Sequence, residues 1–318
     1  MKILISGGLG FIGHEVVRCL QGHEILVIDS LTNYDFIPQD QMMKLFQLRA
    51  GDLRNQVPSK HIDIRDKQPV IQTLYNFKPD VVIHLASFPR QKVVQQNPSV
   101  ASEVMSTGLI NLLEASKGIA SKFVYVSSSM VYGDFDDYVP ETQECHPKGQ
   151  YAIMKYMGEK LVADYCKHFD YTIVRPSAVY GPRDVEDRVL SKFVLNAIRG
   201  EPLKVRGAEE ILDFTYVTDT AAGIALAAVK DCPHDIYNIT RCENIPITLL
   251  MAAKQVVNIL GQGVIEVVDR DLAFPSRGRL DISRAQKDLG YHPTVDFADG
   301  CNEYVTWVKD NYDTVYKS

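Results

Sequence analysis

Short apolar runs alternate with helical patterns through the first half of the chain. Five runs are rich in β-branched or aliphatic residues and predict buried strands, at 2–6, 24–28, 81–85, 123–126 and 171–174. Helical patterns lie between them, most clearly at 108–116 and 151–168. Strands that alternate with helices predict an α/β fold with a parallel, doubly wound sheet and right-handed crossovers. Ligands of such sheets bind at the carboxyl ends of the strands.

The pattern changes after about Arg175. Shorter elements follow, and the chain ends in an amphipathic helix; the breaks are marked by Pro176, Pro182, Gly200, Pro202 and Gly207. We therefore expect a first domain over 1–175, to which part of 213–240 returns, and a smaller lobe over 176–318 at the carboxyl edge of the sheet. Because no Ser/Gly-rich linker separates them, the two parts are expected to interleave.

A glycine-rich turn joins the first apolar run to the first helical pattern. Gly7, Gly10 and Gly13 follow Ile3, Leu4 and Ile5 at G-x-x-G-x-x-G spacing. Gly7 allows a tight turn, Gly10 lets the backbone approach a pyrophosphate, and Gly13 lets the helix pack closely on the strand. Strand, turn and helix come in the order that a dinucleotide site needs, so the turn predicts such a site.

Asp29 ends the second strand, roughly 20 residues after the glycines. A carboxylate at this point is placed to bond both hydroxyls of the adenosine ribose, and it would repel a 2′-phosphate. The sequence therefore favours NAD over NADP. The alternative is a solvated Asp that caps a loop.

Composition narrows the classes of partner. The chain has 318 residues, a net charge of −6 and no run of Lys or Arg, so neither nucleic acid nor an anionic membrane is expected as its main partner. No apolar run is long enough to span a bilayer, and the first strand leaves no room for a signal peptide. The six cysteines lack C-x-x-C spacing, which favours reduced thiols in a cytoplasmic protein over disulfides or a metal site.

Two segments carry candidate catalytic residues. Tyr151 and Lys155 are four residues apart in a helical pattern and so share one face, where the lysine is expected to lower the pKa of the phenol. Tyr151 would then accept a proton from a sugar hydroxyl. Serines 127–129 follow the strand at 123–126, where substrate and nicotinamide would meet. Each signal is weak alone, since surface Tyr/Lys pairs and turn serines are common, but together they predict an enzyme.

In these motifs the chain resembles the extended short-chain dehydrogenase/reductases, specifically the NAD-dependent nucleotide-sugar epimerase/dehydratase family. The resemblance covers essentially the full length. Further segments that carry it are His61-Ile-Asp-Ile-Arg-Asp, Val82-Ile-His-Leu-Ala-Ser, Asn111-Leu-Leu-Glu-Ala, Arg175-Pro-Ser-Ala-Val-Tyr-Gly-Pro-Arg, Asp213-Phe-Thr-Tyr-Val-Thr-Asp and Leu289-Gly-Tyr-His-Pro.

The resemblance implies roles for individual residues. Ser128, Tyr151 and Lys155 would be catalytic, and the substrate would be a nucleotide-diphosphate sugar. Homodimers would pair through the helices after Pro98 and from Tyr151. Residues implied at NAD are Gly7, Gly10, Phe11, Ile12, Gly13, Asp29, Asn33, Asp63, Ile64, Leu85, Ala86, Ser87, Ser127, Tyr151, Lys155 and Pro176.

Departures from the family pattern narrow the chemistry. Members that eliminate water or carbon dioxide usually carry an acidic residue just after the catalytic Ser/Thr, where this chain has Ser129 and Met130, expected on the substrate side. Met105 replaces a common asparagine before the helical pattern at 108–116. Ala178 and Leu212 replace an asparagine and an arginine that usually contact the diphosphate. Candidate replacements are Arg90, Arg188, Lys192 and Arg277 with Arg279, and the alternative for each is a solvated surface cation.

These residues favour an NAD-dependent nucleotide-sugar epimerase that acts at C4 through a 4-keto sugar. The alternative within the same class is a nucleotide-sugar reductase or dehydrogenase that consumes free NAD(P). A 4,6-dehydratase and a non-catalytic dinucleotide-binding protein are less favoured, because the second acid/base is missing while Tyr151 and Lys155 are present.

Overall fold

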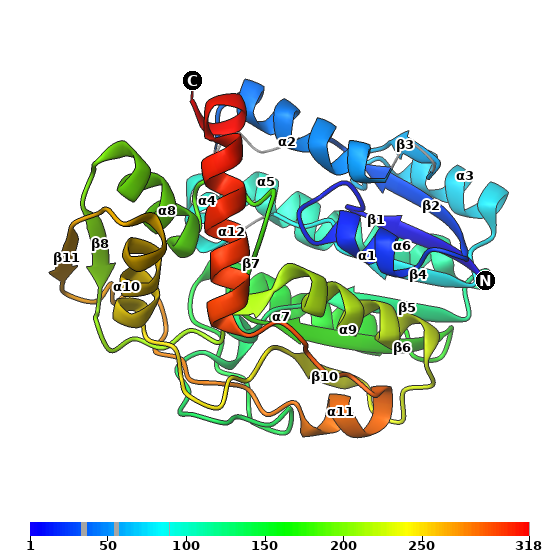
Figure 1. Ribbon diagram of the computed structural model, residues 1–318. Helices are drawn as coiled ribbons and strands as arrows, with labels where there is room; N and C mark the ends of the chain where they lie inside the picture. The colour runs from blue at the N-terminus through cyan, green and yellow to red at the C-terminus, as the bar shows by residue number, and fades with distance from the viewer. Residues whose placement is uncertain (33–36, 54–56, 89, 318) are drawn as a thin grey trace.

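A computed structural model gives the structure of the chain (Figure 1), and it describes residues 1–32, 37–53, 57–88 and 90–317. Asn33, which the resemblance implies at the cofactor, lies outside the described residues.

Seven parallel strands form the central sheet in the order β3-β2-β1-β4-β5-β6-β10. This confirms the predicted α/β class and the doubly wound parallel sheet. In register, Ile3 of β1 lies opposite Ile25 of β2 and Val81 of β4. The strands are β1 Lys2–Ser6, β2 Glu24–Asp29, β3 Ser59–His61, β4 Val81–His84, β5 Lys122–Val126, β6 Asp170–Pro176 and β10 Ile236–Ile239.

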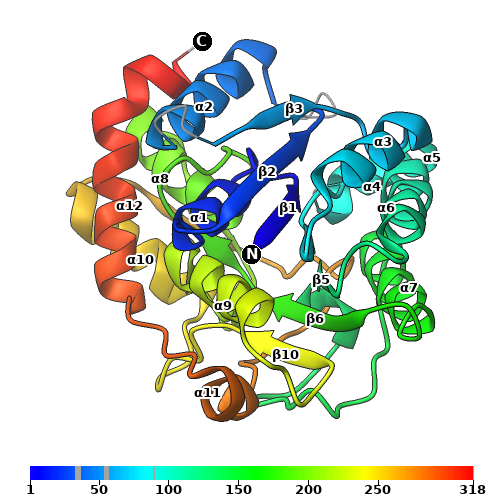
Figure 2. The same ribbon diagram turned by 90° about the vertical axis from the view of Figure 1, so that its right-hand side faces the viewer.

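Helices cover both faces of this sheet (Figure 2). Alternate residues of β1 belong to different cores: Ile3 and Ile5 pack with the helices α1 (Gly13–Cys19) and α9 (Val217–Val229). Leu4 packs with the other face, because successive side chains of a strand point in opposite directions. That face carries α3 Lys67–Phe77, α6 Leu109–Ser116 and α7 Gln150–Asp164, with shorter helices α4 Gln91–Gln96, α5 Pro98–Ser102 and η1 Glu103–Gly108.

A smaller lobe lies beyond the carboxyl ends of the strands (Figure 1). Its own core joins residues of α8, α10 and α12 with residues of α2 from the first half of the chain. α12 runs between the lobe and the sheet in Figure 1. The remaining elements are α2 Gln39–Asp52, η2 Ser129–Tyr132, β7 Val179–Tyr180, α8 Val189–Arg199, β8 Leu203–Arg206, β9 Thr215–Tyr216, α10 Leu249–Leu260, β11 Ile265–Val268, α11 Ser283–Leu289, α12 Phe297–Asn311 and η3 Tyr312–Tyr316.

Two predicted helices have different bounds in the structure. The pattern at 108–116 contains the end of η1, a π-helical segment, and α6 begins only at Leu109. The side chain of Ile64 occupies the space where a Cβ on Gly108 would lie, so this junction packs tightly. The helix that starts near Tyr151 ends at Asp164 rather than His168, because the backbone N–H groups of Tyr165 and Cys166 turn back to Val162 and Ala163.

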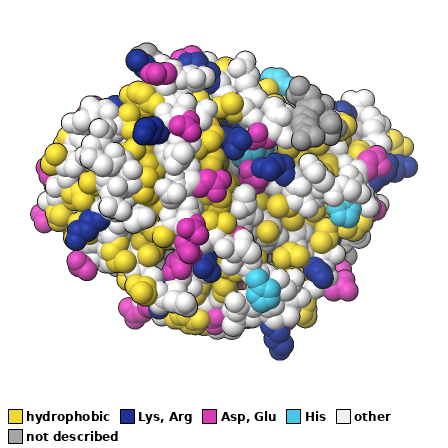
Figure 3. Space-filling view, in the orientation of Figure 1, with side chains coloured by type: hydrophobic (Ala, Val, Ile, Leu, Met, Phe, Trp, Pro, Cys, Tyr) yellow, Lys and Arg dark blue, Asp and Glu magenta, His cyan; other side chains and the backbone are white. Residues whose placement is uncertain are grey.

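The surface charges, the helix lengths and the cysteines of the structure bear on which partners the chain could bind. On the face in Figure 3, positive and negative side chains are interspersed without one large basic patch. Within the described ranges, no helix has both the length and the apolar character that a bilayer crossing requires. All six cysteines are free thiols, and the described residues contain no cluster of three His, Cys, Asp or Glu side chains that could hold a metal.

Candidate active site

The glycine turn after β1 forms a cradle that side chains would fill. Gly7 has φ +76°, and a Cβ there would lie 2.6 Å from the backbone nitrogen of Ala86. A Cβ on Gly13 would collide with the carbonyl oxygen of Gly7, whereas one on Gly10 would approach only that oxygen, at 3.1 Å. Gly7 and Gly13 therefore allow the close packing of turn, helix and β4 loop, while Gly10 leaves its outer side open to a ligand.

Asp29 lies at the end of β2 beside this turn. Its Oδ2 accepts a hydrogen bond from the backbone N–H of Leu9 at 3.0 Å, and its Oδ1 accepts one from Leu31 at 2.9 Å. Burial raises the pKa of the carboxyl, and these two N–H groups and Arg49 oppose that rise. The carboxylate is thus fixed next to the cradle. Its role at the adenosine ribose stays a prediction.

A hollow of about 440 Å³ continues from Asp29 across the next loops. Asp63 lines it and forms an ion pair with Arg65 at 2.7 Å. Ile64 is buried, and its carbonyl oxygen accepts a hydrogen bond from Asn111 at 3.0 Å. The hollow is the size of an adenosine site, and it is lined by Ser30, Thr32, His61, Ile62, Asp63, Arg65, Asp66 and Pro69.

We expect Asp29→Asn to shift the preference between NAD and NADP toward NADP by about tenfold, which corresponds to about 1.4 kcal/mol. The substitution keeps one acceptor oxygen but removes the charge that would repel a 2′-phosphate. Dissociation constants of both dinucleotides, measured by calorimetry on cofactor-free protein, test this. Asp164→Asn on the exposed side of α7 is the control. An unchanged NAD/NADP ratio in Asp29→Asn would remove the proposed ribose role.

Ser128 and Tyr151 converge on a second, larger cavity. Ser128 follows β5 and caps η2, where its Oγ accepts a hydrogen bond from the N–H of Met130 at 3.2 Å. Tyr151 stands in the first turn of α7, and the Ser128 side chain lowers the pKa of its phenol. Both residues line the cavity together with Met130. The phenol and the hydroxyl can therefore reach one ligand atom.

Lys155 lies one turn along α7 but does not act on Tyr151 as the sequence suggests. Its ammonium donates to the carbonyl oxygen of Val126 at 2.7 Å, and burial lowers its pKa to about 7, opposed by Glu159. Burial raises the pKa of Tyr151, and the cations that oppose this rise are Arg188 and Arg90. The expectation that Lys155 lowers the pKa of the phenol is therefore wrong for the chain without its cofactor.

The lowered pKa of Lys155 should make the stability of the fold depend on pH. Its pKa of about 7 in the folded chain lies below the ordinary 10.5, so between these values the unfolded chain binds one more proton. The free energy of unfolding of cofactor-free protein should then gain up to about 1.4 kcal/mol per pH unit from this group as the pH rises above 7. Denaturant titrations from pH 7 to 9.5 should show this gain in the parent and in the exposed control Lys167→Met, but not in Lys155→Met. Identical pH slopes in all three proteins would contradict it.

Other residues expected at NAD lie around the cradle. Phe11 is buried and Ile12 partly buried just before α1, and Pro176 ends β6. The N–H groups of Leu85 and Ala86 both donate to the carbonyl of Ser6 at 2.9 Å, and the hydroxyl of Ser87 donates to the carbonyl of Phe88 at 3.2 Å.

The expectation for Ser127 needs correction. Its hydroxyl donates to Oε1 of Glu159 at 2.5 Å, and Glu159 also binds Arg175 at 2.6 and 2.9 Å. This buried cluster between the sheet and α7 occupies the hydroxyl, so the Ser127 side chain is not available to a cofactor.

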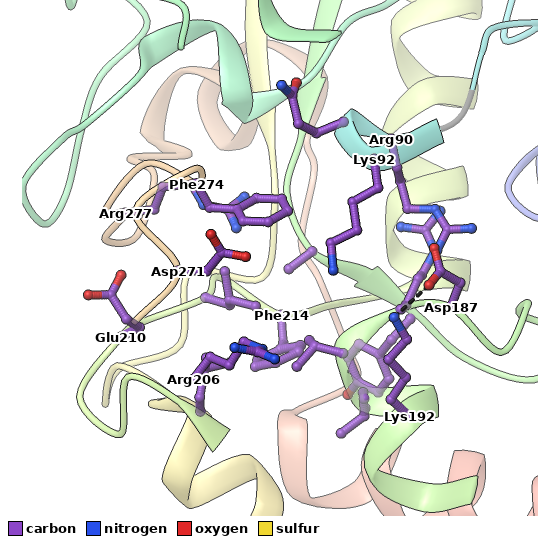
Figure 4. A pocket seen from close by; sticks show the side chains of 18 of the residues that line it. Arg90, Lys92, Asp187, Lys192, Arg206, Glu210, Phe214, Asp271, Phe274 and Arg277 are labelled. Atoms are coloured by element: carbon purple, nitrogen blue, oxygen red, sulfur yellow. Dashed lines mark ion pairs between the residues drawn. The ribbon is translucent and has the colours of Figure 1, made fainter. Parts of the chain in front are cut away.

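The larger cavity has a volume of about 520 Å³ and separates the carboxyl edge of the sheet from the smaller lobe. Eight cationic side chains line it against three carboxylates, although the whole chain has a net charge of −6. Such a wall favours an anionic ligand. Figure 4 shows Arg90 and Lys92 on one side and Arg277 with Phe274 on the other. The cations are Arg90, Lys92, Arg188, Lys192, Lys204, Arg206, Arg270 and Arg277, and the carboxylates are Asp187, Glu210 and Asp271.

Three of the predicted cations form ion pairs with carboxylates. Asp187 binds Arg90 through one oxygen at 2.9 Å and Lys192 through the other at 2.5 Å. The Nε of Arg188 binds Asp184 at 3.0 Å, and its guanidinium lies 5.5 Å from the ring centre of Phe11. Arg188 thus connects the cavity to the glycine turn.

Arg277 has a different environment. Burial lowers its pKa to about 10, and this shift is opposed by Glu210, whose carboxylate is paired with Arg270 at 3.3 Å. Among the described residues, Arg277 has no ion-pair partner, and its buried Nε has no hydrogen-bond acceptor. A partly buried cation that lines a cavity and has no ion-pair partner fits an anionic ligand.

Two other expectations on the substrate side are corrected. Ser129 does not line the cavity, because its side chain is buried in η2 and its Oγ donates to the hydroxyl of Ser177 at 3.1 Å. Arg279 lies outside the cavity, where it pairs with Asp137 and donates to the carbonyl of Asn244.

Many residues that line the cavity are absent from the sequence-based prediction, among them Gln91, Lys92, Asp187, Arg206 and Phe274. Gln91, Lys92 and Asp187 lie within two residues of predicted cations, so a search along those loops would have found them. Arg206 and Phe274 lie outside the motifs that the sequence analysis quotes.

Comparisons with known proteins agree with this geometry. The model of the NAD dependent epimerase/dehydratase family matches residues 3–240. A Bacillus subtilis protein described as an uncharacterized UDP-glucose epimerase is 30% identical, covering 98% of this chain and 99% of its own. The dTDP-glucose 4,6-dehydratase of Neisseria meningitidis is 27% identical, with 98% and 94% covered. The UDP-glucuronic acid 4-epimerase of Bacillus cereus, solved with UDP-glucuronic acid and NAD, superposes with a TM-score of 0.89 at 27% identity, with 98% and 100% covered.

Proposed function

The chain belongs to the NAD-dependent epimerase/dehydratase family, and on this premise we propose that it inverts the configuration at C4 of a nucleotide-activated sugar. Its relatives are NAD-dependent epimerases and dehydratases of nucleotide sugars, and its cofactor is NAD. The cradle at Gly7, Gly10 and Gly13 fits the cofactor's pyrophosphate, and the hollow beside Asp29 fits its adenosine.

Tyr151 and Ser128 divide the proton chemistry. The Tyr151 phenolate takes the proton from the C4 hydroxyl, and the Ser128 hydroxyl holds the same oxygen from its other side. NAD, when bound, would supply the hydride acceptor at C4. Tyr151 would return its proton to the C4 oxygen when the hydride returns to the opposite face of the 4-keto sugar. Arg188 and Arg90 lower the pKa of Tyr151 and so stabilise negative charge on its phenol.

One observation favours epimerisation over elimination: neither of the two residues after Ser128 is acidic. Ser129 is buried against Ser177, and Met130, which lines the cavity, has a thioether. Asp187 also lines the cavity, but each of its carboxylate oxygens is in an ion pair, one with Arg90 and the other with Lys192. A C4 epimerase needs no second acid/base, so it agrees with this set of side chains.

The diphosphate of the substrate would lie among the cations of the larger cavity. Ala178 and Leu212, which line this cavity, offer no polar group to it. We infer that Arg277 replaces the missing contacts from the far wall, with Lys92 and Lys192 extending from α4 and α8. Arg90 and Arg188, whose charges reach Tyr151, would lie nearer the sugar.

The proposed function also assigns a ligand to each part of the chain. We infer that 1–175, with the returning segment in 213–240, binds NAD, and that 176–318 mainly binds substrate. β10, which lies in that segment, pairs with β6 in the sheet. Pairing of two copies through the helices after Pro98 and the helix from Tyr151 stays a prediction; Ile153, 53% exposed on α7, agrees with it.

The first experiment identifies the nucleotides released when purified protein is denatured, by mass spectrometry. Proton NMR then follows UDP-, GDP-, CDP- and dTDP-sugars incubated with the protein and no added NADH. A product that differs only at C4 supports the proposal. A 4-keto-6-deoxy product would assign a dehydratase, and turnover only with stoichiometric NADH or NADPH would assign the alternative reductase.

A further inference from the structure

The helix that carries Tyr151 begins without a cap of its own. α7 starts at Gln150, so Tyr151 is its second residue, and the first four N–H groups of a helix have no partner within it. The residue before the helix is Gly149, which has φ +90° and no side chain to accept a hydrogen bond. The first turn therefore depends on an acceptor from elsewhere in the chain.

Gln91, the first residue of α4, supplies that acceptor. Its side-chain Oε1 accepts a hydrogen bond from the backbone N–H of Tyr151 at 3.0 Å, although the two residues are 60 positions apart. Gln91 is 3% exposed. A Cβ on Gly149 would collide with the amide group of Gln91, so glycine at this position makes room for the contact.

The loop that delivers Gln91 is strained. Arg90, immediately before it, has φ +67°, a conformation that residues other than glycine rarely adopt. Such strain persists only where surrounding contacts determine it, and it concentrates at functional sites. Here one contact is the ion pair of Arg90 with Asp187 and the next is the bond of Gln91 to Tyr151. Arg90 and Gln91, at the start of α4, thus both line the cavity that Tyr151 and Ser128 line.

We propose that Gln91 is a positioning residue for Tyr151: its amide oxygen caps α7 from outside and fixes the turn on which the phenol stands. This inference rests on the proposed function, in which Tyr151 is the base. Without the cap, the first turn of α7 would fray, and Tyr151 would move relative to Ser128. A displacement near 1 Å is enough to lower the rate of a positioned reaction by about 100-fold.

Gln91 also lines the cavity, so a direct contact with substrate is the competing role. The two roles differ in their kinetic effect. Loss of a substrate contact raises KM, whereas loss of positioning lowers kcat with KM unchanged. They also differ in hydrogen exchange, because only the capping role protects the Tyr151 amide in protein without substrate.

The test compares Gln91→Met, which keeps the size but lacks the acceptor, with Gln91→Glu, which keeps an acceptor oxygen. Gln95→Met, on the exposed side of α4, is the matched control. We expect kcat of Gln91→Met to fall by about 10- to 100-fold with KM within about twofold. Deuterium uptake of peptides over 149–153 should be faster than in the parent. Gln91→Glu should restore both, since a carboxylate suits a helix N-terminus.

Several results would overturn the proposal. These are a rise in KM alone, unchanged exchange over 149–153, or a kcat in Gln91→Glu as low as in Gln91→Met. If Gln91→Met does not fold, the test rests on Gln91→Glu. A kcat within about threefold of the parent then supports the proposal, and a larger fall overturns it. Exchange is measured without substrate, so it judges the cap even if the parent turned over no nucleotide sugar, which would instead refute the proposed function.

Discussion

Tyr151→Phe should lower kcat for the nucleotide sugar by about 1,000-fold, within the 10²- to 10⁴-fold range of general acid–base catalysis. The change removes one oxygen, the atom that exchanges the proton, and leaves a ring of the same shape in the cavity. KM should change little, because the cationic wall that binds an anionic substrate is untouched. Steady-state rates with the sugar identified by NMR provide the measurement.

The control for Tyr151→Phe is Tyr75→Phe, since Tyr75 is 66% exposed on α3 and remote from the cavity. It should retain the parental kcat. Both variants should also keep the parental affinity for NAD and the parental melting temperature. Activity of Tyr151→Phe equal to that of the parent would refute the assignment of Tyr151 as the base.

The sheet could be predicted because its central strands carry their own signal. β1, β4 and β5 are short runs of buried aliphatic residues, and burial on both faces is what parallel strands require. β3 shows why the rest could not. Ser59–His61 is polar and exposed at the edge of the sheet, so nothing in its composition distinguishes it from a loop.

The candidate active site could likewise be predicted only in part. Tyr151 and Ser128 could be predicted from local spacing, since one begins a helix and the other follows a strand. The direction of Lys155 could not, because four-residue spacing gives its face of α7 but not the Val126 carbonyl that holds its ammonium. Ser129 is adjacent to Ser128 in sequence, yet the short helix η2 turns it toward Ser177.

Contacts between distant segments leave no pattern along the chain. Gln91 meets Tyr151 only because α4 and α7 pack on the same face of the sheet. Arg90 meets Asp187 across the cavity for the same kind of reason. Composition shows that the chain has enough cations, but only the fold shows that eight of them line one cavity.

Arg277→Met should raise KM for the nucleotide sugar by about 10- to 100-fold while kcat changes by less than about threefold. Arg277 is partly buried, its inaccessible Nε has no hydrogen-bond acceptor, and it has no ion-pair partner among the described residues. Ala178 and Leu212 give the cavity no other polar contact at their positions. A charge-assisted hydrogen bond contributes about 1.5–3 kcal/mol, and 1.4 kcal/mol is a factor of ten in binding. Arg277→Lys, which keeps the charge but not the planar fork, should fall between.

Inhibition by the nucleoside diphosphate without its sugar identifies what Arg277 binds. If the guanidinium contacts the diphosphate, Arg277→Met should weaken this inhibitor by the same factor as the substrate, because both carry the same phosphates. The exposed Lys254→Met on α10 should change neither constant, which separates a local contact from the general charge of the lobe. A weakened substrate with an unchanged nucleoside diphosphate would move Arg277 from the phosphates to the sugar, and the diphosphate would then depend on Lys92 and Lys192.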